Sequence, residues 1–173
     1  MCAVKRYRVL FVAMSVLLVA GHGLAAEEAP AHPVFPEVVF SSLDGNAAVT
    51  MSAFRGRPVL LTFWASWCGP CRVELPELSK LYGELVGTGF VLMTVNVDQN
   101  PAAGRGFLKS LGLSLPVYRL DPRDTKSIGI DALPANILLD AEGRFVRAYK
   151  GYTPEVVEEV RRLVLEMTTT KQP

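Results

Sequence analysis

Cys68 and Cys71 are separated by two residues, and the third cysteine of the chain, Cys2, lies far away near its start. A disulfide between residues so close in sequence closes a very small loop and adds little to the stability of a fold. A structural zinc site needs about four ligands, and His32 is the only histidine after the first 25 residues. The pair therefore indicates thiol redox chemistry, and we expect no metal and no bound cofactor.

The elements around the two cysteines must place them where they can react. Val59 to Ala65 is a continuous run of apolar and β-favouring residues, typical of a strand buried on both faces of a sheet. A helix is predicted from about Cys68 to Val86, because leucines recur there at spacings of three and four. The cysteine pair is thus expected where a buried strand passes into the first turn of a helix.

The beginning of a helix suits a reactive cysteine for an electrostatic reason. Its first N–H groups have no partner within the helix and carry a partial positive charge. A Cys68 thiolate is stabilised there, which lowers its pKa from about 8.5 toward about 7. Cys71 lies one helical turn further on and can attack the mixed disulfide that Cys68 forms with a substrate. Gly69 leaves room in this loop, and Pro70 fixes the backbone as the helix begins.

Further helices and strands predict the fold class. The order β-α-β-α, followed by β-β-α, predicts an α/β fold with a mixed sheet. The expected elements are a hairpin formed by 38–43 and 47–50, a helical turn at 51–54, strands at 90–97, 115–120, 135–140 and 145–149, helices at 101–111 and 124–128, and a last helix that begins after Thr153.

The segment Phe63 to Arg72, which reads FWASWCGPCR, closely resembles the active-site segment of thioredoxin. Its continuation through Glu74-Leu75-Pro76 resembles the TlpA/ResA-like branch, whose members are exported and often membrane-tethered disulfide reductases. The resemblance covers about Phe40 to Leu165. It implies a thioredoxin fold with a mixed central sheet flanked by helices, an N-terminal β-hairpin, and an αβ insert before a cis-proline.

The resemblance also implies a substrate-binding surface. Pro134 lies where the family has its cis-proline, which faces the cysteines, and the backbone beside it pairs with the substrate chain. Leu133 would shape that groove, and Trp67 matches a tryptophan of the docking surface. The alternatives are an ordinary loop proline at 134 and a Trp67 that only caps the core. We take Trp67, Pro70, Leu133 and Pro134 as the predicted substrate-binding residues.

Glu74 is the third predicted catalytic residue, after Cys68 and Cys71. Thioredoxin has a buried aspartate at the position of Thr62, and a threonine cannot take over its proton transfer. The TlpA/ResA-like branch instead has a glutamate at the position of Glu74. Helical spacing places Glu74 near Cys71, and a partly buried carboxyl with a raised pKa could carry the proton of Cys71. The alternative is a solvated charge near the start of the helix.

The start of the chain resembles an export signal. Three basic residues, among them Lys5 and Arg8, precede the apolar run Val9 to Ala20, which is shorter than the about 20 residues that span a bilayer. We expect 1–25 to be a signal peptide cleaved before Ala26. An uncleaved anchor that tethers the protein through 9–26 is the alternative. The rest of the chain is expected to divide into a linker at 26–36, a thioredoxin-like domain at 37–168 and a polar tail at 169–173.

These observations predict a periplasmic enzyme that reduces disulfides in exported client proteins. The resemblance implies that electrons arrive from a membrane thiol–disulfide donor and that clients carry disulfides or cysteine pairs, such as those of apocytochrome c or of copper sites. The alternatives are a thiol oxidant and a Cu(I) chaperone that uses the same two thiolates. The formal net charge is +1, and no long basic run is present, so we expect no nucleic acid partner.

Overall fold

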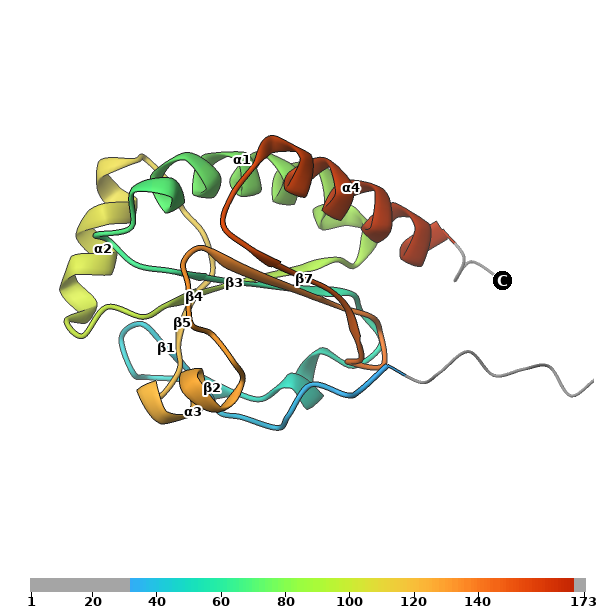
Figure 1. Ribbon diagram of the computed structural model, residues 1–173, viewed down its shortest axis with the longest axis horizontal. Helices are drawn as coiled ribbons and strands as arrows, with labels where there is room; N and C mark the ends of the chain where they lie inside the picture. The colour runs from blue at the N-terminus through green and yellow to red at the C-terminus, as the bar shows by residue number, and fades with distance from the viewer. Residues whose placement is uncertain (1–31, 170–173) are drawn as a thin grey trace, which may run out of the picture. The chain divides into compact units, whose positions relative to one another are not determined.

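The computed structural model describes residues 32–169. The predicted signal peptide at 1–25, and with it the question of a tether through 9–26, lies outside the described residues. The described part forms a seven-stranded sheet in the order β2-β1-β5-β4-β3-β6-β7 with four α-helices (Figure 1). The strands are β1 Phe40–Ser42, β2 Ala48–Val49, β3 Val59–Trp64, β4 Val91–Asn96, β5 Val117–Arg119, β6 Ala135–Leu139 and β7 Phe145–Lys150; the helices are α1 Gly69–Leu85, α2 Pro101–Ser110, α3 Pro122–Ser127 and α4 Pro154–Thr169, with short 3-10 turns at Met51–Phe54 and Val86–Thr88.

The sheet is mixed, as the sequence predicts. β3 lies near its middle, parallel to β4 and antiparallel to β6. All six residues of β3 are buried, because neighbouring strands flank it and side chains cover both of its faces. The predicted N-terminal hairpin is present as the antiparallel pair of β1 and β2. The predicted insert is present as α2 and β5, with β5 joined to β4 on one side and to β1 on the other.

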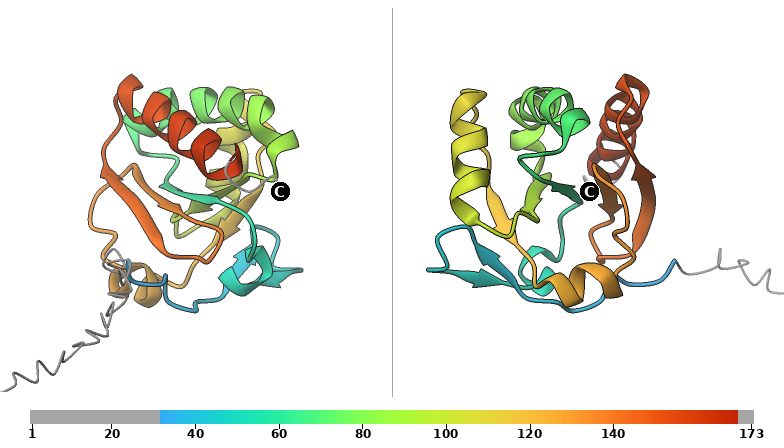
Figure 2. Two further views of the ribbon diagram at one scale, coloured as in Figure 1. Left: turned by 90° about the vertical axis from the view of Figure 1, so that its right-hand side faces the viewer. Right: turned by 60° about the vertical axis from the view of Figure 1, so that its left-hand side comes forward.

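The two faces of the sheet are covered differently. α2, α1 and α4 lie in a row on one face (yellow-green, green and red in the right-hand view of Figure 2). Leu60 and Trp64 of β3 pack on this face, Leu60 with the leucines and valines of α1 and α4 and Trp64 with α2. Leu61 and Phe63 point the other way, into a core that Phe35, Phe40 and Met51 close from the hairpin side. Because successive side chains of β3 point to opposite faces of the sheet, every second residue of the strand faces the helical layer that contains α1.

The predicted linker at 26–36 is too long, because its last residues belong to the domain. Phe35 is only 2% exposed and packs against Phe40 and Phe145. Its N–H donates to the carbonyl of Gly143, and the N–H of Phe145 donates to the carbonyl of Pro33. Burying an aromatic ring and pairing these backbone groups fixes the segment to the sheet. The folded unit thus begins before residue 37, and the rest of the linker lies outside the described residues.

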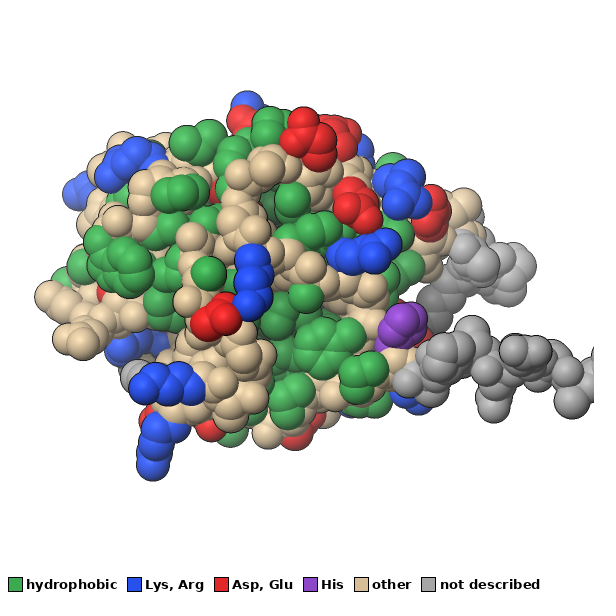
Figure 3. All heavy atoms as spheres, in the orientation of Figure 1, with side chains coloured by type: hydrophobic (Ala, Val, Ile, Leu, Met, Phe, Trp, Pro, Cys, Tyr) green, Lys and Arg blue, Asp and Glu red, His purple; other side chains and the backbone are tan. Residues whose placement is uncertain are grey.

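The last helix is slightly longer than the sequence predicts. α4 continues to Thr169, the first residue of the predicted tail, and residues 170–173 lie outside the described part. Within 32–169 no helix has the length and hydropathy needed to cross a membrane. On the face drawn in Figure 3, acidic and basic side chains both occur among apolar and polar ones.

α2 approaches the sheet so closely that one of its positions requires glycine. A Cβ atom at Gly104 would lie 2.8 Å from the Cγ and Oδ1 atoms of Asn96 on β4. We expect Gly104→Ala to lower the free energy of unfolding by about 1–2 kcal/mol, because overpacking outweighs the higher helix propensity of alanine. Gly106→Ala in the same helix is the matched control, since a Cβ there meets nothing within 4 Å. Urea denaturation should show the control slightly more stable than the parent; equal effects of both substitutions would contradict the close approach.

Candidate active site

Cys68 and Cys71 form a disulfide at the amino end of α1. Cys68 is the N-cap residue, with extended backbone angles, and Pro70 occupies the first turn. The sulfur of Cys68 accepts a hydrogen bond from the backbone N–H of Cys71 at 3.2 Å. This N–H is one of the free donors at the helix start, and it would stabilise a thiolate on Cys68. The position predicted for the pair is therefore the position that the structure shows.

The two sulfurs differ in access to solvent. Cys68 is 5% exposed and Cys71 is completely buried. Beside Cys68, Trp67 is 72% exposed, and Val73 on α1 is also exposed. An incoming disulfide thus meets Cys68 first, across an apolar rim, while Cys71 can be reached only through Cys68.

A groove of about 510 Å³ runs past the disulfide. Its lining brings Trp67, Pro70 and Leu133, three of the four predicted substrate-binding residues, together with Cys68. The peptide bond between Leu133 and Pro134 is cis, and Pro134 is buried and does not line the groove. The sequence analysis missed further lining residues, among them the apolar side chains Val97 and Ile130 and the exposed Asp131.

Glu74 lies completely buried on α1. The alternative of a solvated surface charge is therefore wrong. Desolvation raises the pKa of this carboxyl to about 7, although a hydrogen bond from Asn136 acts in the opposite direction. The Nδ2 group of Asn136 donates to Oε1 of Glu74 at 2.7 Å, and the Thr62 hydroxyl donates to Oδ1 of Asn136 at 2.8 Å. Oε2 of Glu74 is buried without a hydrogen-bond partner.

A buried aspartate anchors the loop that carries the cysteines. Asp98, which follows β4, accepts hydrogen bonds from the backbone N–H and the hydroxyl of Ser66. The side chain of Asn96 donates to the same carboxylate at 2.8 Å. The sequence reading missed this anchor, although polar residues at the carboxyl end of a buried strand were a signal for it. Because Ser66 is two residues before Cys68, Asp98 fixes the approach of the chain to the nucleophile.

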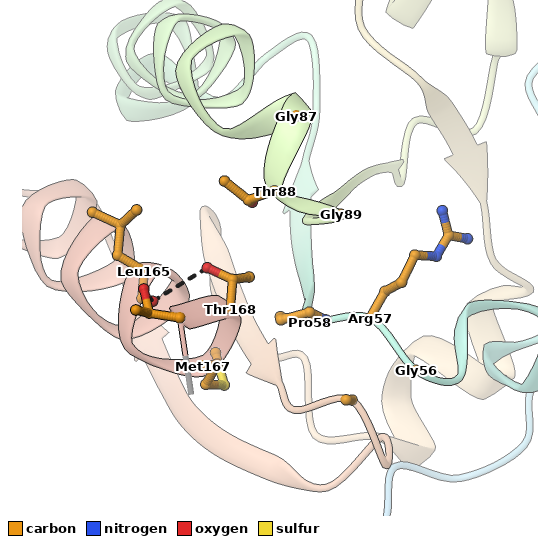
Figure 4. A pocket seen from close by; sticks show the side chains of 11 residues that line it. Gly56, Arg57, Pro58, Gly87, Thr88, Gly89, Leu165, Met167 and Thr168 are labelled. Carbon is orange, nitrogen blue, oxygen red and sulfur yellow. Dashed lines mark hydrogen bonds between the residues drawn. The ribbon is translucent and has the colours of Figure 1, made fainter. Parts of the chain in front are cut away.

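A second hollow lies at the opposite end of β3 (Figure 4). It is lined by glycines of two loops, by Pro58, which precedes β3, and by the last turn of α4. The Thr168 hydroxyl hydrogen-bonds to the carbonyl of Leu165 there, and the Arg57 side chain points away from this helix. None of the predicted site residues lines this hollow. Within residues 32–169, no three His, Cys, Asp or Glu side chains come together as a metal site would need.

Fold and site together define a thiol–disulfide oxidoreductase of thioredoxin type. The sequence model of the Redoxin family matches residues 29–164, so the chain belongs to that family. It is 32% identical to the thiol-disulfide oxidoreductase ResA of Bacillus thuringiensis subsp. konkukian over 127 residues, which are 72% of each chain. It is 33% identical to the thiol:disulfide interchange protein DsbE of Pseudomonas fluorescens biotype C over 156 residues, 86% of this chain and 84% of that protein.

A solved structure agrees with these relatives. The thioredoxin domain of a thiol-disulfide oxidoreductase from Bacteroides vulgatus superposes with a TM-score of 0.67 at 26% identity, covering 79% of this chain and 99% of that chain. The expected thioredoxin fold and the resemblance to the ResA-like branch are thereby confirmed.

Proposed function

We propose that this oxidoreductase is exported to the periplasm and reduces disulfides in client proteins there. One observation carries the proposal: the sulfur of Cys68, the less buried of the two cysteines, accepts a hydrogen bond from the backbone N–H of Cys71 in the first turn of α1. The names of the relatives, disulfide oxidoreductase and interchange protein, support the same chemistry. The expected signal peptide at 1–25 supports export.

The reaction proceeds in two exchanges. The Cys68 thiolate attacks a client disulfide, so that a mixed disulfide forms and the first client sulfur leaves as a thiolate. Glu74 in its carboxylate form takes the proton of Cys71, whose thiolate then attacks the sulfur of Cys68. The Cys68–Cys71 disulfide forms, the second client sulfur leaves, and two electrons have passed to the client. The proton held by Glu74 is then released to that thiolate or to water.

A thiol–disulfide donor of the membrane would return two electrons to the oxidised pair and make the cycle repeat. Clients with paired cysteines, such as apocytochrome c or copper-site proteins, fit a groove with apolar walls formed by Trp67, Val97 and Leu133. An extended client segment can lie in this groove beside the cis-proline loop. The family resemblance and the apolar walls of the groove support these partners.

The direction of electron flow is tested by equilibrating the protein with glutathione. We expect a reduction potential of about −270 mV, as in thioredoxin. Pro70 has no N–H to donate at the start of the helix, which limits the stabilisation of the Cys68 thiolate. A potential of about −120 mV, as in DsbA, would overturn the reductase proposal and indicate a thiol oxidant.

The Cys71→Ser variant can be used to identify the client proteins. Without the second thiol, the mixed disulfide on Cys68 cannot be resolved from within, so client adducts should accumulate. Adducts from the exported compartment are separated on non-reducing gels and identified by mass spectrometry. Cys68→Ser is the matched control and should collect none. Absence of adducts on Cys71→Ser, with the variant present in that compartment, would refute the client-reductase function.

A further inference from the structure

The side chains of Thr62 and Asn136 meet beneath the active site on two neighbouring strands. They lie directly opposite each other in the antiparallel pair of β3 and β6. The alternation along β3 puts Thr62 on the same face as Leu60 and Trp64, which is the face covered by helices. Glu74 projects from α1 toward this pair, since the amide of Asn136 bonds to its carboxyl. Thr62 and Glu74 are fully buried, and Asn136 is 1% exposed.

The direction of these hydrogen bonds sets the orientation of the amide. The Thr62 hydroxyl donates to the amide oxygen of Asn136, so the NH₂ group is the end that faces Glu74. A carboxylate can only accept hydrogen bonds, whereas a protonated carboxyl can also donate. An amide that presents its N–H therefore favours the charged form of Glu74, and an amide turned around would favour the neutral form.

The surroundings of Glu74 offer few other charges that could set its ionisation. On its own helix, the titratable residues one turn away are Cys71, three residues before it, and Glu77, three residues after it. In the segment before α4, the pKa of the Tyr152 phenol is raised by burial first and then by the charges of Glu77, Glu74 and Glu155, while Lys80 lowers it. No cation is among the causes that act on Glu74. Among the described residues, the amide of Asn136 donates the hydrogen bond that the Glu74 carboxyl accepts.

We infer that Asn136, oriented by Thr62, is a positioning residue that keeps Glu74 ready to accept a proton. The amide occupies Oε1, which leaves the unpartnered Oε2 as the atom that takes the proton of Cys71. Thr62 thus has a role here, although it cannot transfer a proton. This inference rests on the proposed function of Glu74 as the proton acceptor.

The test is the pH dependence of disulfide reduction by the purified protein, with insulin as substrate and dithiothreitol as reductant. Turnover needs the Glu74 carboxylate, so the rate should fall on the acid side. Asn136→Leu removes the donor and should move the midpoint of this acid limb up by about one pH unit, the effect of losing a hydrogen bond to a charged group. Thr62→Val, which keeps the shape, should move it in the same direction by less, because the freed amide can turn.

Thr94→Val is the matched control. Thr94 lies beside Thr62 in the register of β3 and β4 and is also buried, but its hydroxyl donates to the carbonyl of Pro116. It should leave the midpoint unchanged while costing similar stability. If Asn136→Leu does not fold, Thr62→Val carries the test alone.

The Glu74→Gln variant distinguishes the role of Glu74 as proton acceptor from the role of Asn136 and Thr62 in positioning it. In this background Asn136→Leu should have no effect on the pH profile. If Glu74→Gln itself leaves the profile of the parent unchanged, the proposed proton acceptor is wrong. If Glu74→Gln removes the acid limb but neither Thr62→Val nor Asn136→Leu moves it in the parent, Glu74 acts without them and our inference is refuted.

Discussion

Cys68→Ser is expected to lower disulfide reduction to the rate of uncatalysed exchange with the reductant. A serine hydroxyl is not ionised near neutral pH and does not attack sulfur as a thiolate does. Cys71 remains in this variant, but it is completely buried and lies behind the position of Cys68. It therefore cannot replace the lost nucleophile. Insulin reduction, followed by turbidity, measures the loss directly.

Alkylation of the two single-cysteine variants distinguishes the roles of the sulfurs. Cys71→Ser keeps the outer thiol at the helix start and should react rapidly with iodoacetamide, with a pH midpoint below the about 8.5 of a free cysteine. Cys68→Ser keeps only the buried thiol and should react slowly at every pH. Equal rates in the two variants would show that the order of attack assigned here is incorrect.

The sequence predicts the position of this pair well because the signals are local. A run of almost entirely apolar and β-favouring residues indicates a buried strand, and the Cys-Gly-Pro-Cys segment begins three residues after it. The predicted strand at 59–65 and helix at 68–86 differ from β3 and α1 by one residue at each altered end. The short strands are also found, since glycine or proline turns bound them.

Two features of the site depend on distant pairings that the sequence does not encode locally. Thr62 and Asn136 are 74 residues apart, and they meet only through the register of β3 against β6. Ser66 and Asp98 are 32 residues apart and meet because β3 and β4 end at the same edge. The segment that ends at Pro36 is rich in alanine, proline and glutamate, which predicts a linker, and a single aromatic residue such as Phe35 does not reveal its packing partners.

Glu74 illustrates the difference between finding a residue and knowing its state. The family resemblance located it, and helical spacing placed it near Cys71. Only the packing of α1 against the sheet shows that it is completely buried and bound to an amide. That burial has a cost for the folded protein that can be measured separately from catalysis.

Glu74→Gln is expected to make the oxidised protein more stable above pH 7 while it slows turnover. The carboxyl has an ordinary pKa of 4.5, and burial raises it to about 7 in the folded protein. Between these values the folded state binds more protons than the unfolded state. The free energy of unfolding therefore falls as pH rises from about 4.5 to about 7 and is level above, a loss of about 3 kcal/mol. Glutamine stays neutral and escapes this loss.

Urea denaturation at pH 4 and pH 8 tests the prediction. Parent and Glu74→Gln should be similar at the lower pH, and the variant should gain up to about 3 kcal/mol over the parent at the higher one. Glu77→Gln is the control on the same helix, because Glu77 is partly exposed and pairs with Lys80. It should change stability by no more than about 1 kcal/mol at either pH. A Glu74→Gln variant less stable than the parent at pH 8 would contradict the desolvation argument.

Turnover should respond to Glu74→Gln in the opposite direction. Loss of the proton acceptor is expected to slow reduction at neutral pH by about a hundredfold, the lower range of general base catalysis. A residue kept only for packing would lose stability and activity together when replaced. A gain in stability combined with a loss of turnover is what a buried group retained for its chemistry produces. Measuring both in one variant therefore tests whether the buried carboxyl serves the exchange reaction of Cys71.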